Sequence, residues 1–131
     1  MGKAKLVSTG EDLSIITYGS GVHWAKELIE SDKSISADIL DLRTLMPWDM
    51  DAVRTSVEKT GKVLILHEDT LTGGIGAEIG AWISENCFHY LDGPIMRVAS
   101  LDTPVPFSSN LEQNFLGKTQ LRDKVTELLE F

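Results

Sequence analysis

The chain has 131 residues, a formal net charge of −8, 42% hydrophobic residues and 24% charged residues, which suits one globular domain with a substantial core. The acidic balance argues against binding to the phosphodiester backbone of nucleic acid and favours a basic protein partner. No apolar run is long enough to cross a bilayer, and the single cysteine, Cys87, forms no internal disulfide, so a reducing intracellular setting is indicated.

The first part of the chain predicts two short strands and a helix. Residues 3–9 alternate in part between apolar and polar, and residues 14–18 are mostly apolar. The two flank a turn at residues 10–12 and are candidates to pair as an edge hairpin. Gly19-Ser20-Gly21 then breaks the second strand, either as an anion cradle or as a plain turn with Ser20 as the cap. A helix is expected over residues 22–31.

The next unit is a strand over residues 37–42, followed by a capped helix. Asp49 is placed to accept a hydrogen bond from the free backbone N–H groups of the first helical turn. Met50, Val53 and Val57 are expected on the inward face of this helix. Gly61 follows where a C-terminal glycine cap belongs.

The most informative stretch is residues 62–83. Residues 63–66 predict a strand buried on both faces, and His67-Glu68-Asp69 form a polar break after it. A glycine loop at residues 73–76 then opens an amphipathic helix that ends near Tyr90. Because such a loop exposes backbone N–H groups that bind phosphate, the stretch has the outline of a nucleotide-binding turn.

The spacing of the glycines favours packing over nucleotide binding. Gly74, Gly76 and Gly80 read G-x-G-x-x-x-G, which is one residue longer than the dinucleotide fingerprint, and the next strand ends without the expected acidic residue. We therefore interpret Gly73, Gly74 and Gly76 as structural glycines that allow a tight turn and a close approach of helix to strand.

Two pairs of side chains are candidates for chemistry. His67 and Glu68 stand at the carboxyl end of a strand, where open α/β sheets bind ligands, and such a histidine can act as a general base or proton relay. Neighbouring residues of a strand point to opposite faces, so the alternative is a polar cluster that holds loops or a subunit contact. Cys87 and His89 lie two residues apart on a helix and face away from each other, which favours core packing of Cys87. No complete catalytic set emerges.

The last part of the chain predicts a strand over residues 95–99 and an extended segment over residues 102–107, which its two prolines enforce. One or two helical turns are expected within residues 108–115, and a final helix over residues 118–130. Strands that alternate with helices indicate βαβ units and a mainly parallel sheet with right-handed crossovers.

The order of motifs resembles the C-terminal domain of the transketolase superfamily. The segments that carry the resemblance are VLILHEDTLTGGIGAEIGAWI, YLDGPIMRVASLDTPVPF, LEQNFL and the final helix. The nearest resemblance is to the beta chain, or the beta half of a fused chain, of thiamine-diphosphate-dependent 2-oxo acid dehydrogenases of the branched-chain or pyruvate type. Another thiamine-diphosphate enzyme, such as transketolase or deoxyxylulose phosphate synthase, and a stand-alone nucleotide-binding module are the alternatives.

The resemblance implies a three-layer α/β fold with a five-stranded, mostly parallel sheet and one antiparallel edge strand. It implies that residues 1–10 are a leading segment or edge strand from a missing upstream region, and that residues 11–131 form a single domain. In the family, thiamine diphosphate and magnesium lie between two other domains, so this domain is expected to hold no cofactor or metal and no catalytic residue of its own.

The resemblance also implies partners. They are the upstream domains, an alpha chain or alpha half, a second subunit in a homodimer or heterotetramer, and the subunit-binding domain of the dihydrolipoyl acyltransferase core. In relatives the docking surface includes the aspartate of the LD-x-P turn and the terminal carboxylate, which match Asp92 and Phe131. His67 and Glu68 are a possible interface or active-site rim. Where relatives commonly carry proline before the last helix, this chain has Gly117. The expected location is the bacterial cytoplasm or the mitochondrial matrix.

Overall fold

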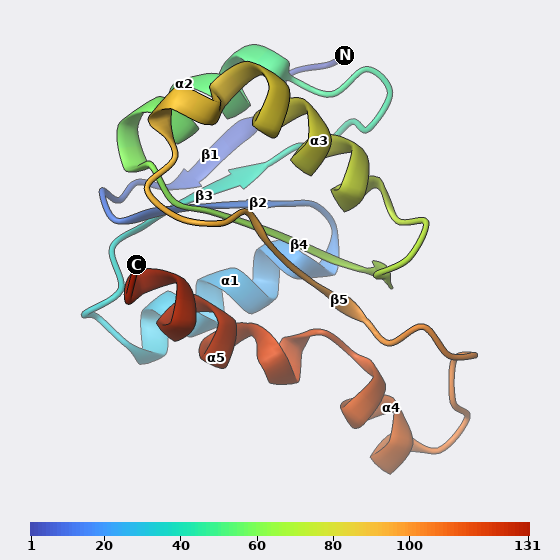
Figure 1. Cartoon of the computed structure of the whole chain (residues 1–131). Coiled ribbons are helices and arrows are strands. Elements are labelled where there is room, and N and C mark those ends of the chain that lie inside the picture. The colour runs from blue at the N-terminus through green and yellow to red at the C-terminus, as the bar shows by residue number, and fades with distance from the viewer.

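The computed structural model describes residues 1–131 as a sheet between two layers of helices (Figure 1). The five strands are arranged in the order β1-β3-β2-β4-β5. Their bounds are β1 Lys5–Ser8, β2 Leu13–Thr17, β3 Ala37–Asp41, β4 Val63–Thr70 and β5 Met96–Ser100. Three neighbouring pairs are parallel, and only β1 with β3 is antiparallel. This confirms the expected three-layer sheet with one antiparallel edge strand.

Two helices cover each face of the sheet. The helices are α1 Ser20–Ser31, α2 Met50–Thr60, α3 Ile75–Cys87, α4 Ser109–Phe115 and α5 Lys118–Leu129, with a 3-10 turn η1 at Phe88–Tyr90. Helices α1 and α5 lie on one face, α2 and α3 lie on the other, and α4 projects past the end of the sheet (Figure 1). Each face has its own core, of 14 and 10 buried residues. None of these helices combines the length and the apolar character that crossing a bilayer requires.

The expected hairpin between the first two strands is wrong. Strand β1 pairs with β3 instead, with Lys5 opposite Asp41 and Leu6 opposite Leu40. The reason is that β2 is buried along its whole length and both of its edges are taken, by β3 on one side and β4 on the other. A central strand has no free edge for its sequence neighbour, so β1 crosses to the open edge of β3.

The caps of α2 are as expected. The Asp49 carboxylate accepts a hydrogen bond from the Ala52 N–H at 3.2 Å, and Gly61 adopts the left-handed conformation with φ 70° and donates its N–H to the Val57 carbonyl. The same carboxylate accepts from the Ala4 N–H at 3.0 Å, so it also holds the leading segment against the helix. These hydrogen bonds, that from Ala4 above all, hold the pKa of Asp49 below its usual value.

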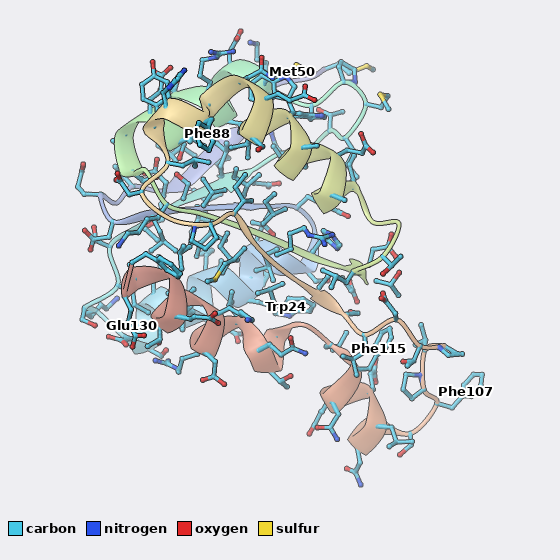
Figure 2. All side chains as sticks on the ribbon, in the orientation of Figure 1. Trp24, Met50, Phe88, Phe107, Phe115 and Glu130 are labelled. Carbon is cyan, nitrogen blue, oxygen red and sulfur yellow. The ribbon has the colours of Figure 1, made fainter.

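One residue of α2 departs from the expected inward face. Val53 and Val57 are fully buried, whereas Met50 is 43% exposed and lies on the outside of the helical layer (Figure 2). Side chains of a helix lean toward its N-terminus. Because Met50 is the first residue of α2, its side chain extends past the part of the sheet that the helix covers.

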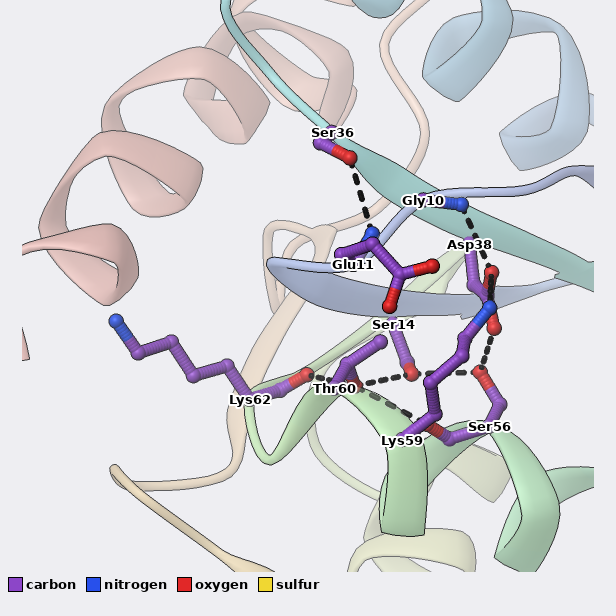
Figure 3. A network of polar contacts seen from close by, with 9 residues as sticks. All are labelled: Gly10, Glu11, Ser14, Ser36, Asp38, Ser56, Lys59, Thr60 and Lys62. Carbon is purple, nitrogen blue, oxygen red and sulfur yellow. Dashed lines mark hydrogen bonds and ion pairs between the residues drawn. The ribbon is translucent and has the colours of Figure 1, made fainter.

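A buried polar network at the amino ends of β2 and β3 was not foreseen from the sequence (Figure 3). The Asp38 carboxylate is 2% exposed. It accepts hydrogen bonds from the Gly10 N–H at 3.0 Å, from the Lys59 ammonium at 2.6 Å and from the Ser56 hydroxyl at 2.7 Å. One carboxylate thus joins the turn before β2, strand β3 and helix α2.

The network continues from the carboxylate into the core. The hydroxyl of Ser14 on β2 lies 2.6 Å from that of Ser56 and 2.7 Å from that of Thr60, both on α2. Every polar side chain of this group therefore has a partner, which removes the cost of burying it.

Replacing Asp38 by Ala should lower the free energy of unfolding by about 3 kcal/mol, because the change leaves a buried N–H and an ammonium without their acceptor. Urea denaturation should show the loss as a lower midpoint at an unchanged m-value. The control is Glu11→Ala in the adjoining turn, where the side chain is exposed and the change should stay within about 0.5 kcal/mol. Equal midpoints for the two variants would contradict a stabilising role for the network.

Candidate functional site

The polar residues after residue 66 belong to the strand rather than to a break. Strand β4 runs on to Thr70, which pairs with Ser100 of β5 after a shift in register. The expected polar break at His67-Glu68-Asp69 is therefore wrong, because these residues continue the ladder along β5. The Ser100 hydroxyl also donates a hydrogen bond to the Glu68 carbonyl, which links the two strands here.

His67 is enclosed by the protein. Its side chain is 0% exposed, and its Nδ1 lies 3.0 Å from the Asp69 carbonyl oxygen. A carbonyl only accepts, so Nδ1 carries the proton in this bond and Nε2 has a free lone pair. That Nε2 is buried and has no hydrogen-bond partner. Burial lowers the pKa of His67, so the imidazole is neutral at pH 7.

The glycine loop packs directly on this imidazole. A Cβ at Gly74 would lie 2.6 Å from His67 Cε1, and one at Gly76 would lie 2.7 Å from His67 Nε2. Gly73 has φ 79°, in the left-handed region, and nothing lies within 4 Å of the position of its Cβ. Gly74 and Gly76 thus permit a close approach of α3 to β4, and Gly73 permits the turn between them.

Glu68 lies on the opposite face of β4 from His67. Its carboxylate accepts a hydrogen bond from the Ser20 hydroxyl at 2.8 Å. Ser20 opens α1 but does not cap it, since the N-cap is Gly19 at φ 56° without a side-chain bond. His67 therefore contacts the α3 layer and Glu68 the α1 layer, and the structure does not bring the two into one acid–base pair.

A cavity of about 430 Å³ opens beside Glu68 at the carboxyl ends of β2 and β4. It is lined by Tyr18, Glu68, Asp69, Thr70, Val105, Glu112, Phe115 and Leu116. Tyr18 stacks on His67 with ring centroids 6.1 Å apart, and burial, followed by the charge of Asp69, raises the pKa of its phenol. Sequence reasoning missed most of these residues. The position of Tyr18 at the carboxyl end of a predicted strand is the one pattern that points to it.

The glycine loop and the segment after β5 are joined beside this cavity. The Asp102 carboxylate accepts from the Thr72 N–H at 2.8 Å and from the Thr72 hydroxyl at 2.5 Å. These bonds hold the pKa of Asp102 below its usual value. The HEDTLTGG and LDTPVPF segments, which are far apart in the sequence, are thereby fixed side by side.

The other predicted pair shows no chemistry. Cys87 is 1% exposed and packs in the core with α2 and α3, and burial raises the pKa of its thiol. His89 lies on the surface in the following 3-10 turn. A buried thiol with a raised pKa is a poor nucleophile.

Asp92 and Phe131 come together at the other end of the sheet. The Asp92 N–H donates to the Gly61 carbonyl at 2.7 Å, and a Cβ at the neighbouring Gly93 would lie 3.1 Å from Phe131 Cβ. The Lys62 ammonium donates to the Leu129 carbonyl at 3.1 Å and holds the end of α5. Asp92 is exposed, and Phe131 is 65% exposed.

The residues present do not fit a diphosphate cofactor with its metal. No three histidine, cysteine or acidic side chains are grouped as metal ligands require. The space under the loop at Gly74 and Gly76, where a phosphate would have to lie, is filled by the His67 ring. The contacts at this loop are packing contacts between α3 and β4.

Comparison with known proteins places these features in context. Residues 2–120 match the family described as the C-terminal domain of transketolase. The 2-oxoisovalerate dehydrogenase subunit beta of Bacillus subtilis (strain 168) is 42% identical, over 100% of this chain and 41% of that protein. The pyruvate dehydrogenase E1 component subunit beta of Staphylococcus aureus (strain Mu50) is 40% identical, over 100% of this chain and 41% of that protein.

A solved structure shares the fold. It is a split-gene transketolase, an inactive beta4 tetramer, with a TM-score of 0.80 and 23% identity over 98% of this chain and 42% of that one. The chain therefore spans less than half the length of the relatives and of the structure to which it is similar.

Two glycines of α3 provide a matched test of the contact with His67. Gly76→Ala should lower the free energy of unfolding by about 2 kcal/mol, because the added methyl group overlaps a buried ring. Gly80→Ala, whose Cβ would meet its nearest atom at 3.6 Å, should be neutral or stabilising by up to about 1 kcal/mol through helix propensity. Urea denaturation of both variants tests this, and a Gly76→Ala protein as stable as Gly80→Ala would contradict the contact.

The lowered pKa of His67 predicts a stability that falls in mild acid. As pH drops below about 6.5, the unfolded chain binds a proton at this residue while the folded chain does not, so the free energy of unfolding decreases. His67→Asn keeps a donor near the Asp69 carbonyl but cannot titrate. Its stability deficit relative to the wild type should therefore shrink between about pH 7 and pH 5. Urea denaturation across this range gives the slopes, with His89→Asn as the surface control, and a constant deficit would contradict the prediction.

Proposed function

The chain belongs to the transketolase C-terminal domain family, and from this membership we propose that it is the assembly and docking domain of the decarboxylating component of a 2-oxo acid dehydrogenase complex. In this proposal the chain corresponds to the C-terminal part of a beta subunit, or of a fused beta half. Similarity over the whole chain to beta subunits of 2-oxoisovalerate and pyruvate dehydrogenases supports it. The observation that carries the docking role is that Asp92 and Phe131 are both exposed at the end of the sheet where Gly93 lies against Phe131.

The parent enzyme would oxidatively decarboxylate a 2-oxo acid and pass the acyl group to lipoamide. Thiamine diphosphate and magnesium would be held by the part of the parent that lies outside this chain, which is more than half of a beta subunit of the length seen in Bacillus subtilis. The isolated domain would bind neither and would not be an active enzyme. Its setting would be the bacterial cytoplasm or the mitochondrial matrix, where such complexes work.

The docking patch is defined as Asp92 and Phe131. It offers the Asp92 carboxylate, which lies against Gly61, and the exposed ring of Phe131, which lies against Gly93, on a chain of net charge −8. This combination suits a basic partner with some apolar surface. The partner would be the subunit-binding domain of the dihydrolipoyl acyltransferase. The patch has a rigid base, because Gly61 supports Asp92, while Gly93 and Lys62 hold the end of α5.

A second surface suits assembly with other subunits. Strand β5 is an edge strand of the sheet, and a shallow cavity of about 530 Å³ runs beside it between α3 and the turn that precedes β5. Its walls include Ala77, Gly80 and Ala81 of α3 and the exposed ring of Phe88. Small residues beside an exposed aromatic side chain and an open strand edge are common in subunit interfaces. The second subunit or the alpha chain would cover this surface.

Asp92→Ala should weaken binding to the subunit-binding domain of a bacterial 2-oxo acid dehydrogenase acyltransferase by about tenfold or more. The reason is that a basic group of that domain would lose the carboxylate with which it pairs. Titration calorimetry measures the affinity. Gly61→Ala should weaken it as well, because the added Cβ would lie 2.2 Å from Asp92 Oδ2 and displace the carboxylate. Asp123→Ala on the exposed side of α5 is the control and should bind as the wild type does. Unchanged affinity for Asp92→Ala would remove this partner from the proposal.

A further inference from the structure

The segment that follows β5 leaves the body of the domain and carries uncovered apolar side chains. We call residues 101–116 the arm; it includes the LDTPVPF segment and α4. Val105 is 65% exposed, Leu111 is 59% exposed, and Phe107 is fully exposed at the far tip of the arm (Figure 2). A cluster of this kind on one projecting segment marks a contact surface rather than ordinary scatter.

The arm is held in place rather than loosely attached. Phe115 is 5% exposed at the base of the arm, where it lines the cavity with Tyr18. The Leu101 N–H donates to the Phe115 carbonyl at 3.0 Å and closes the arm on itself, and the Asp102 carboxylate bonds Thr72 of the glycine loop. The exposed side chains are therefore presented in a preformed arrangement, which lowers the entropic cost of binding.

The cavity between the arm and the sheet is acidic and contains no cation. Glu68, Asp69 and Glu112 line it, and no lysine, arginine or histidine does. None of the three carboxylates forms an ion pair within the chain. Their partners are the Ser20 hydroxyl for Glu68 and the Thr70 N–H for Asp69. All three carboxylates are exposed, so this side of the cavity presents negative charge to solvent and attracts a positively charged group.

We propose that the arm and the acidic cavity together form a docking surface for a segment of the parent subunit outside this chain, one that carries an arginine or lysine among apolar residues. The cation would enter between Glu68, Asp69 and Glu112, and the apolar residues would cover Val105 and Phe107. This inference rests on the proposed function, since it takes the chain to be part of a longer subunit.

Three observations favour this occupant. The chain corresponds to 41% of the beta subunit of Bacillus subtilis, so the rest of a subunit of that size must pack against some surface. The arm follows β5 and lies at the carboxyl edge of the sheet, whereas Asp92 precedes β5 and lies at the amino edge, so both contacts can form at once. A second copy of this chain is disfavoured, because its net charge of −8 opposes an acidic cavity.

The test compares how fast a thiol reagent reaches the arm tip in the 131-residue chain and in a chimera of full beta-subunit length. The thiol introduced by Phe107→Cys should react rapidly with a maleimide in the 131-residue chain. The natural thiol of this chain, Cys87, is buried. In a chimera that places this chain in the Bacillus subtilis beta subunit, labelling should slow by more than about tenfold, since the site is covered. Lys33→Cys, on an exposed turn far from the arm, should label equally in both proteins.

A charge reversal tests the chemistry of the occupant. Adding Glu112→Lys to the Phe107→Cys chimera should restore at least about half of the lost labelling rate, because a positive charge in the cavity repels the incoming cation. Equal labelling of the short chain and the chimera would overturn the proposal. Labelling of the chimera that stays slow after Glu112→Lys would also overturn it. So would slow labelling that appears only when the alpha subunit is added.

Two further measurements cover a chimera that does not fold and separate the role of the arm from that of Asp92. If the chimera fails to fold, cysteine at the position aligned with Phe107 in the intact Bacillus subtilis beta subunit gives the same readout without a junction. Binding of the chimera to the acyltransferase's subunit-binding domain is measured in parallel. If the chimera labels rapidly but still binds the subunit-binding domain, the arm surface alone is refuted. If it labels slowly but does not bind, the docking role of Asp92 alone is refuted.

Discussion

The closeness of α3 to β4 is the constraint on which the rest of this domain depends. The His67 ring fills the space that side chains at Gly74 and Gly76 would otherwise need, and it is sealed there with one nitrogen unpaired. This contact sets the path of the glycine loop, and Asp102 then fixes the arm against that loop through Thr72. A loop with the outline of a phosphate-binding turn is thereby a packing device, because the protein's own imidazole occupies the place of a ligand.

The fold keeps two surfaces apart at opposite ends of one parallel sheet. Residues that precede strands, such as Gly61 and Asp92, gather at the amino edge, and residues that follow strands, such as Tyr18 and the arm, gather at the carboxyl edge. Parallel strands make this separation automatic, since all their carboxyl ends meet on one side. The buried Asp38 network braces the amino edge from within. A single rigid body can therefore contact two partners without one contact disturbing the other.

Local sequence patterns predicted most of the fold but little of the site. Asp49 and Gly61 were identified because capping depends on neighbours within four residues along the chain. The partner of β1 was not, because strand pairing depends on which edges remain free once the central strands have assembled. The same limit applies to the Asp38 network and to the cavity beside Glu68. Their members come from distant segments, and only the register of β2, β3 and β4 determines which side chains meet.

The position of Phe131 has a consequence for the order in which the domain folds. Its ring reaches Gly93 only when the last helix has been made and has packed on the sheet, where Lys62 holds the Leu129 carbonyl. This contact joins two segments that are far apart in the sequence, so it forms late, after both have packed at the same end of the sheet. Under the proposed docking role, a half-folded copy would carry Asp92 without Phe131 beside Gly93, and it would be left out of an assembled complex.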